Sequence, residues 1–254
     1  MALRMVYFPS NEYPFYKEIP GEFEWVSGLN LKRKQMNITK LHDKIHSVFP
    51  DMKVLEISSK SMQNIGVELS ALNLKMYLVS IGKMVSVENI YQGSKVYFDC
   101  NDLTDLYMVD PIKAKKDPRI TSRRCPEYYI LNGNRYDIDN HGSFYNAIYI
   151  QALEQNAGLA NSLLQYDAFT DIEFNHKKSN CCQAKAAAIY VGQHKICDDH
   201  NIVNGVNLDV YMLQSGFKTG FICENDISGE MHEKLIDLYK KQTSQTKKVI
   251  EKCV

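Results

Sequence analysis

The chain has 254 residues, and its 30 basic and 30 acidic side chains give a formal net charge of zero at pH 7. A zero net charge excludes the class of proteins whose whole surface attracts nucleic acid, so any contact with DNA or RNA has to be local. No stretch approaches the ~20 consecutive apolar residues of a membrane helix, and the first residues lack the apolar core of a secretion signal. We therefore expect a soluble, cytoplasmic protein without membrane contact, folded as a single domain over residues 1–254.

The N-terminal half predicts extended segments followed by helices. The first twenty-odd residues are rich in proline, tyrosine and phenylalanine, and we expect them to run over the body in extended form. Residues 31–49 predict a helix, because apolar side chains recur there at helical spacing. These side chains are Ile38, Leu41, Ile45, Val48 and Phe49. Residues 53–59 predict a short strand, and residues 67–87 predict two strands joined around Gly82 that lead into a helix beginning near Glu88.

The C-terminal half is richer in helical patterns. A helix is expected from about Asp102 to Lys116, and the pair Asn132-Gly133 predicts a hairpin turn. Two helices are expected at residues 143–156 and 157–166, separated by a break at Asn156. An alanine-rich helix follows at 183–196, and an amphipathic helix is expected at 228–252. These elements predict an α+β fold, dominated by helices and carrying a small β element.

The seven cysteines favour a reducing compartment, because their number is odd and no two of them form a CxxC pair. His194, Cys197 and His200 stand at three-residue intervals, a spacing that can place three metal ligands on one helical face. A helix end that carries charged residues explains the same segment. We therefore predict no metal site and no cofactor.

One polar stripe interrupts the apolar segment from Ser86 to Phe98. On a helix, Glu88, Gln92 and Lys95 would fall within roughly 60° of one another. Tyr91 and Phe98 border this stripe, which is the arrangement of a pocket wall. The alternative is a solvated strip on a surface helix, in which Glu88 and Gln92 form an ordinary pair.

The segments around this stripe resemble the NADAR family, also called YbiA-like. That family carries a serine segment, a hairpin with glycine, and a helix of the pattern Glu-His-x-x-Gln-x-x-Lys. Ser70 takes the place of the serine, and Glu88, Gln92 and Lys95 take the places in the helix pattern. The chain departs from the family at Asn89, which replaces the histidine. It departs again at Asn146, where we expect an acidic residue.

The resemblance is to the branch of NADAR antitoxins that are encoded beside DarT-type toxins, which ADP-ribosylate guanine in DNA. The segments that carry it are "LEISSKS", "GVELSALNL", "VENIYQGSKV", "TDLY", "AKKDPR" and "YDAFTDIEFN". The resemblance extends from about Val6 to Tyr190 and implies a YbiA-like fold. Residues 191–254 would then form a divergent helical C-terminal extension of the same domain.

The resemblance implies cleavage of the N-glycosidic bond between ribose C1 and a nitrogen atom. Such a bond breaks through a transition state with oxocarbenium character, which a carboxylate stabilises, and Glu88 is the candidate acid and base. Lys95 is the candidate nucleophile, because a neutral amine can attack C1 and form a Schiff base. Burial favours the neutral amine, whereas a close Glu88 carboxylate opposes it. Lys60 is the alternative for the lysine role.

The remaining candidates would bind the ligand. We assign Ser70, Asn73, Tyr91, Gln92 and Asp171 to ligand binding, with turn or strand-end polar residues as the alternative for Ser70 and Asn73. Asp171, like Glu173, could instead lie on the wet side of a strand. The basic segments at residues 113–116 and 119–124 are candidates for phosphate contacts, or are solvated charged loops. Tyr91 or Tyr145 could stack on a guanine that is single-stranded or flipped out of a duplex.

The function expected from these residues is that of an ADP-ribosyl hydrolase that removes ADP-ribose from guanine in DNA and acts as an antitoxin. Its partners would be the ADP-ribosylated guanine in DNA and ADP-ribose as the product, with a cognate DarT-type toxin as a further candidate. One alternative is an N-glycosidase that acts on a small ribosylated metabolite. Another is a protein without catalytic activity that binds ADP-ribose or the toxin.

Overall fold

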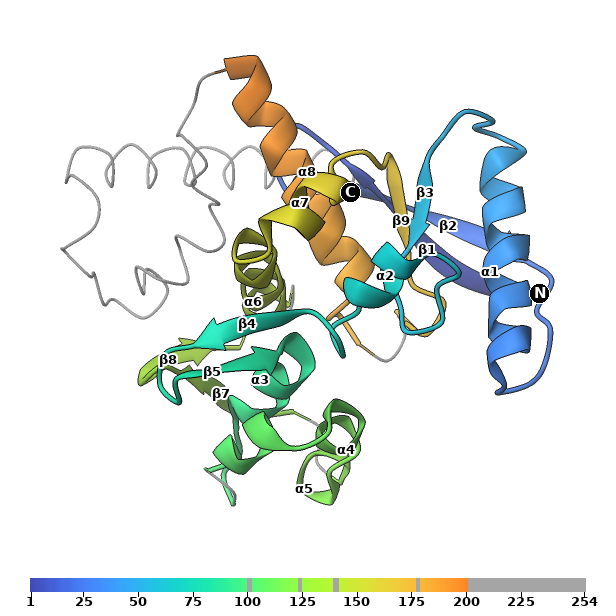
Figure 1. Ribbon diagram of the computed structural model, residues 1–254. Coiled ribbons are helices and arrows are strands. Elements are labelled where there is room, and N and C mark those ends of the chain that lie inside the picture. The colour runs from blue at the N-terminus through green and yellow to red at the C-terminus, as the bar shows by residue number, and fades with distance from the viewer. Residues whose placement is uncertain (100–101, 123–124, 139–141, 177–178, 201–254) are drawn as a thin grey trace, which may run out of the picture.

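A four-stranded sheet forms the upper part of the molecule (Figure 1). The computed structural model describes residues 1–99, 102–122, 125–138, 142–176 and 179–200. The strands of the upper sheet lie in the order β2 (Tyr16–Phe23), β1 (Ala2–Pro9), β9 (Ala168–Thr170) and β3 (Val54–Glu56). Strands β3 and β9 are parallel, and the other pairs are antiparallel. The chain is therefore α+β, as predicted.

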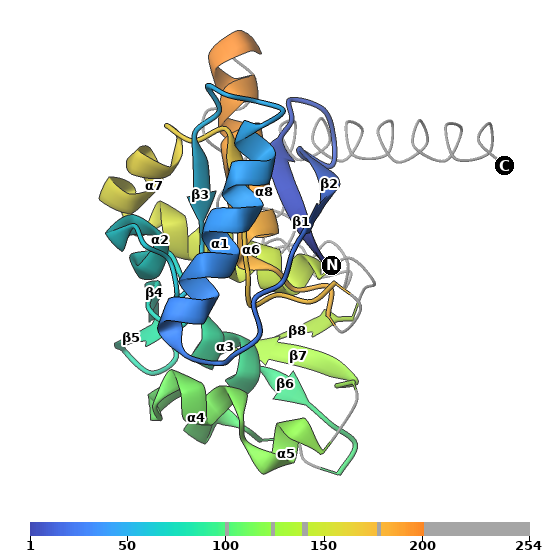
Figure 2. The same ribbon diagram turned by 90° about the vertical axis from the view of Figure 1, so that its right-hand side faces the viewer.

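Helices cover both faces of this sheet. Helix α1 (Leu31–His46) packs on one face and α8 (Gln183–His200) on the other, as the two views show (Figures 1 and 2). Side chains of a strand point alternately to opposite faces, so Val54 packs toward α1 whereas Leu55 belongs to the larger core on the α8 side. Ala168 and Phe169 of β9 repeat this alternation.

Helix α6 (Ser143–Glu154) connects the upper part to the lower part of the molecule, because it contacts α8, α3 and β4. It is followed by α7 (Ala157–Leu163), and α2 (Asn64–Glu68) packs near α7. The hydroxyl group of Tyr149 in α6 is buried and donates a 2.7 Å hydrogen bond to the carbonyl oxygen of Leu69. The alanines at the start of α8 are fully buried, and their small side chains allow close packing against α6.

The lower part holds two small sheets and several short helices. The hairpin of β4 (Lys75–Leu78) and β5 (Lys83–Ser86) is confirmed, and so is the turn between β7 (Tyr128–Leu131) and β8 (Asn134–Asp137). The first strand was predicted to begin at residue 67, but residues 67–68 end helix α2 and the strand begins only at Lys75. In that turn Asn132 and Gly133 both have positive φ angles, 51° and 82°. The other elements are α3 (Val87–Gly93), β6 (Lys95–Val96), η1 (Thr104–Met108), α4 (Pro111–Lys115) and α5 (Pro118–Thr121).

Several expected elements differ from the observed ones. The N-terminal residues are extended, but β1 lies inside the sheet between β2 and β9 instead of running over the body. Helix α1 ends at His46, so Val48 and Phe49 lie beyond it and are exposed. The single helix expected at residues 102–116 is two elements, because Asp110 caps a new helix that starts at Pro111.

Other sequence predictions concern the C-terminal region. Helix α8 continues to His200, so residues 191–200 extend the same helix that packs on the sheet. The amphipathic helix predicted at 228–252 lies outside the described residues. Within the described residues, no helix combines the length and apolar character needed to cross a membrane.

Close packing of α8 on the N-terminal hairpin gives a prediction for stability. A Cβ atom at Gly192 would meet the backbone oxygens of Ser10 and Phe15, whereas a Cβ atom at Gly158 in α7 would meet nothing within 4 Å. We expect Gly192→Ala to lower the free energy of unfolding by about 1–3 kcal/mol, because backbone atoms cannot easily give way. The matched control Gly158→Ala should raise it by up to about 1 kcal/mol through helix propensity. Urea denaturation measures both, and equal effects of the two substitutions would contradict the packing.

Candidate functional site

Helix α3 is fixed at its start by the segment that precedes β4. The backbone amides of Val87 and Glu88 donate 2.9 Å hydrogen bonds to the carbonyl oxygens of Leu74 and Ala71, respectively. Ser86 caps the helix by accepting a hydrogen bond from the backbone amide of Asn89. The first turn of α3, with Glu88, is therefore held against the core.

Helix α3 is shorter than the sequence predicts, and Lys95 is not part of it. The helix ends at Gly93, where a Cβ atom would come within 2.5 Å of the Tyr107 ring. The chain then enters β6, in which Lys95 pairs with Tyr129 of β7. The prediction of one helical stripe through Lys95 is therefore wrong, because Lys95 lies in a strand. The helix ends at Gly93, which packs closely against Tyr107.

The three polar side chains nevertheless form a hydrogen-bonded row. The Lys95 ammonium group donates to Oε1 of Gln92 over 2.7 Å, and Nε2 of Gln92 donates to Oε1 of Glu88 over 2.7 Å. All three side chains are buried. The alternative of a solvated strip on a surface helix is thereby contradicted. Gln92 separates the amine from the carboxylate, because its two ends bind one group each.

Lys115 of α4 adds a fourth member that the sequence analysis placed only in a basic segment. Its Nζ atom lies 3.1 Å from Oε2 of Glu88. The Lys115 side chain is 59% exposed and the Glu88 side chain only 5% exposed, so Lys115 lies on the solvent side of this carboxylate. Helix α4 packs beside α3 (Figure 1). No periodic pattern in the sequence distinguishes Lys115 from its basic neighbours, which is why it was missed.

The surroundings of Lys95 change its acidity. Burial lowers the pKa of its amine to about 8, and Glu88 opposes part of this shift. The ammonium group also lies 4.4 Å from the centre of the Tyr91 ring. At pH 7 about one-tenth of such an amine is neutral, far more than for an ordinary lysine.

Aromatic side chains form the wall beside this row. The hydroxyl group of Tyr91 lies 3.4 Å from that of Tyr129 and 3.2 Å from Sγ of Cys181. Tyr145 packs edge-on against Tyr91 with ring centres 5.2 Å apart, and it is buried. Tyr91 is partly exposed and is the better placed of the two predicted stacking residues. Burial raises the pKa of Tyr91 well above its ordinary value, so the phenol stays neutral.

Asp171 follows β9 and is buried, which contradicts its alternative assignment to the wet side of a strand. Its Oδ1 atom accepts hydrogen bonds from the backbone amides of Glu173 and Phe174. Burial and the nearby Glu56 carboxylate raise the pKa of Asp171, and the charge of Lys115 opposes part of this rise. Asp171 therefore belongs to the same charged region as Lys115. Glu173 is exposed and forms an ion pair with Lys34 at 2.7 Å.

Glu56 is a buried carboxylate that the sequence analysis did not single out. It accepts hydrogen bonds from the hydroxyl groups of Ser58 and Thr170 and from the backbone amide of Ile172. Burial raises its pKa. A glutamate inside the apolar segment "VLEI" was the available signal. These three hydrogen bonds make Glu56 a link between β3 and the segment after β9.

The comparison with protein families shows the family to which the chain belongs. A family model described as DarT1-associated NADAR antitoxin matches residues 2–203. The chain belongs to this antitoxin family. The match begins earlier and ends later than the resemblance seen between Val6 and Tyr190. A comparison with curated proteins found no match.

Two residues of this NADAR antitoxin that depart from the family pattern have different surroundings. Asn89 bonds with Ser86 through its side chain, and its Nδ2 atom donates to the carbonyl oxygens of Leu106 and Val109. Asn89 thus ties α3 to η1. The buried Oδ1 atom of Asn146 has no hydrogen-bond partner among the described residues, which leaves an acceptor available.

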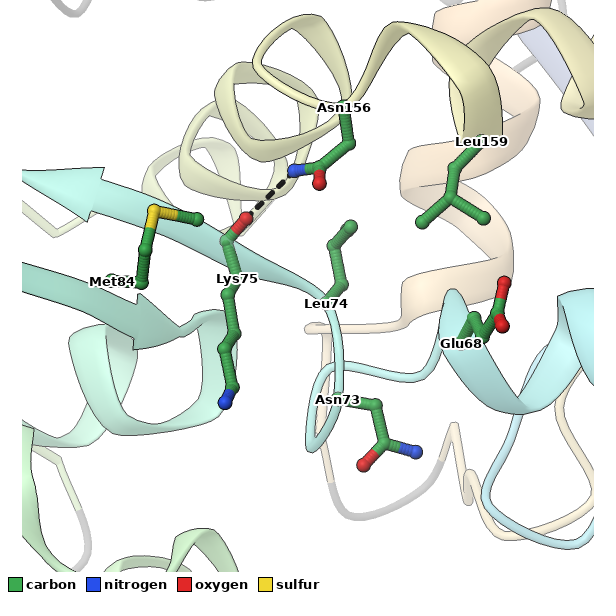
Figure 3. A pocket seen from close by; sticks show the side chains of 7 residues that line it. All are labelled: Glu68, Asn73, Leu74, Lys75, Met84, Asn156 and Leu159. Carbon is green, nitrogen blue, oxygen red and sulfur yellow. Dashed lines mark hydrogen bonds between the residues drawn. The ribbon is translucent and has the colours of Figure 1, made fainter.

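Ser70 and Asn73 of the antitoxin lie on the segment that supports α3. Ser70 is buried, and its hydroxyl oxygen accepts a hydrogen bond from the amide of Leu72. Asn73 is exposed and donates to the carbonyl oxygen of Val67. Asn73 lines a hollow of about 430 Å³ whose walls come from α2, β4, β5 and α7 (Figure 3). Its other lining residues are Glu68, Leu74, Lys75, Met84, Asn156 and Leu159. Ligand binding by Ser70 and Asn73 stays a prediction.

The basic segment of the antitoxin is only partly available for phosphate. The guanidinium group of Arg119 is held by the carboxylates of Asp105 and Asp117 at 2.7–3.1 Å. Arg123 and Arg124 lie outside the described residues. Lys113 and Lys116 are exposed on or beside α4. Any phosphate contact in the described part of this segment is therefore expected from α4.

The metal site considered for the antitoxin gains no support. Within the residues that the structure describes, no group of three His, Cys, Asp or Glu side chains could hold a metal ion. Nδ1 of His194 donates to the carbonyl oxygen of Tyr190 over 2.9 Å. The side chains of Cys197 and His200 lie outside the described residues.

Proposed function

We propose that this NADAR antitoxin hydrolyses the N-glycosidic bond that joins ADP-ribose to guanine in DNA. The observation that carries the proposal is the buried row of Glu88, Gln92 and Lys95, with the pKa of the Lys95 amine lowered to about 8. A protein that only binds ADP-ribose needs no such amine. Perturbed titratable groups beside a carboxylate are typical of catalytic sites.

In the proposed reaction, the neutral Lys95 amine forms a bond to ribose C1 while the bond from C1 to the guanine nitrogen breaks. The carboxylate of Glu88 stabilises the positive charge that develops at C1, takes the proton that the attacking nitrogen loses, and passes this proton to the departing guanine nitrogen. The sugar ring opens to a Schiff base with Lys95. Water adds to this imine, and ADP-ribose leaves as the amine is restored.

The arrangement of Gln92 removes the conflict between the two catalytic residues. A carboxylate in direct contact with Lys95 would hold the amine in its charged form. The Gln92 amide lies between the two groups and binds both. Glu88 therefore acts on Lys95 without direct contact, and burial determines the direction of the pKa shift of Lys95.

The proposed DNA substrate has to present its guanine outside the base stack, because the row is buried. A single-stranded or flipped guanine could stack on Tyr91, a residue that is partly exposed. The exposed lysines of α4 would contact the phosphates beside it. The substrate would thus approach from the side on which Lys115 covers Glu88.

The test is release of ADP-ribose from an oligonucleotide that carries ADP-ribosylated guanine, in single-stranded and duplex form. We expect release from the single strand at least as fast as from the duplex, because no base pair has to open. An unmodified oligonucleotide and free ADP-ribosylated guanosine are the controls. Release from the nucleoside alone would favour the small-metabolite alternative. Binding of ADP-ribose without any release would favour the binding alternative.

A further inference from the structure

The two carboxylate oxygens of Glu88 face different partners, Lys115 on one side and the Gln92 amide on the other. Oε2 contacts Lys115 directly at 3.1 Å, whereas Oε1 reaches Lys95 only through the Gln92 amide. The four side chains thus form a chain in the order Lys115, Glu88, Gln92, Lys95. One cation is exposed and the other is buried, so the two ends of the chain differ in their access to solvent.

We propose that Lys115 is a positioning residue that occupies the Glu88 carboxylate and so leaves the Lys95 amine free to act as the nucleophile. This inference rests on the proposed function. Lys115 would act on the protonation state of Lys95 and not on the substrate, since its own amine is paired with Glu88 and lies on the solvent side.

Lys115 lowers the pKa of Lys95 through two electrostatic effects. The positive charge of Lys115 lowers the pKa of Lys95 directly. Its pairing with Glu88 also neutralises the carboxylate that would otherwise raise the pKa of Lys95. Lys115 itself stays charged. Partial desolvation beside the site lowers its pKa, but the carboxylates of Glu88, Asp171 and Glu173 together outweigh this effect, and the net pKa is raised.

Other charged or titratable groups face these amines. Lys95 is influenced by the thiols of Cys181 and Cys125, which precede α8 and β7. Lys115 is influenced by the carboxylates of Asp171 and Glu173, which follow β9. The thiols raise the pKa of Lys95, so they act against Lys115 and cannot replace it.

The experiment titrates Lys95 directly in the full chain. The chemical shift of its Cε atom is followed by ¹³C NMR over pH 6–11 in protein labelled at lysine, with the resonance assigned by its absence in Lys95→Arg. The variants are Lys115→Met, Lys115→Arg and Lys113→Met. Lys113→Met is the matched control, because it removes the same charge from the same helix without an ion pair to Glu88. The pH dependence of ADP-ribose release is measured in parallel.

The expected result is a higher titration midpoint of Lys95 in Lys115→Met. A rise of one pH unit leaves about tenfold less neutral amine at pH 7, and the rising limb of the pH–rate profile should move by the same amount. Lys115→Arg should restore the midpoint, and Lys113→Met should leave it unchanged whatever its effect on the rate. An unchanged midpoint in Lys115→Met, or an equal rise in Lys113→Met, would overturn the proposal.

The NMR titration separates this inference from the proposed function. If the wild-type protein releases no ADP-ribose, the proposed function fails, while the midpoint of Lys95 still reports whether Lys115 controls it. If release occurs and the midpoint does not respond to Lys115→Met, only the inference fails. A loss of activity at every pH without a moved limb would also contradict it, since it would indicate a purely structural role.

Discussion

Glu88→Gln is expected to abolish ADP-ribose release from modified DNA while the fold persists. A carboxylate that stabilises positive charge and transfers a proton contributes about 10²–10⁴-fold to the rate. Glutamine has nearly the same shape and can still accept a hydrogen bond from Gln92, so the row keeps its geometry. It can neither carry the negative charge nor deliver a proton. We therefore expect the rate of single-turnover release to fall by at least about 100-fold.

The control for this substitution is Glu22→Gln, which changes an exposed glutamate on β2. It should leave the rate of release unchanged. Circular dichroism and thermal melting establish that Glu88→Gln is folded. A folded Glu88→Gln protein that keeps a tenth or more of the wild-type rate would remove Glu88 from the reaction and contradict the assignment.

Lys95→Met is expected to prevent covalent capture of the sugar. In the presence of sodium borohydride, the Schiff base of the wild-type protein should be reduced to a stable amine that intact mass spectrometry detects. Methionine fills a similar volume but has no amine, so no adduct can form at position 95. The substitution removes a buried cation and leaves Oε1 of Gln92 without its donor, which costs about 1–3 kcal/mol of stability.

Lys60 provides the discriminating comparison for this result. It lies in the loop after β3 and is partly exposed, and its amine forms no ion pair with a described residue. Lys60→Met should therefore still be captured by borohydride, with the adduct located on Lys95 by peptide mapping. An adduct on Lys60 would reverse the assignment. Release by Lys95→Met at the wild-type rate would instead indicate direct attack by water with Glu88 as the base.

Local sequence patterns were sufficient to predict the elements whose structure depends on residues that are close together in the chain. The buried face of α1 follows from the spacing of Ile38, Leu41 and Ile45, and the turn of β7 and β8 follows from the tolerance of Asn132 and Gly133 for positive φ. The resemblance correctly brought Glu88, Gln92 and Lys95 together, although the reason was a helix followed by a strand and not one continuous helix.

Long-range contacts set the features that were missed. The position of β1 inside the sheet depends on β9, which lies more than 150 residues away in the chain. The end of α3 coincides with close packing of Gly93 against the ring of Tyr107, and the contact of Lys115 with Glu88 depends on how α4 packs beside α3. The spacing of apolar residues describes one element at a time and contains no information about contacts between elements.

The place of β9 also sets the order in which the chain can fold on the ribosome. Strand β9 lies between β1 and β3, so these two early strands have no partner in common until residue 170 has been synthesised. Gln183 then joins the end of β3 to the segment before β4, because it donates to Ile57 and accepts from Ala71. Pairing over such long separations is slow, and synthesis proceeds at about 5–20 residues per second. The antitoxin therefore gains its central sheet only late in translation, and a message truncated before β9 cannot yield a working copy.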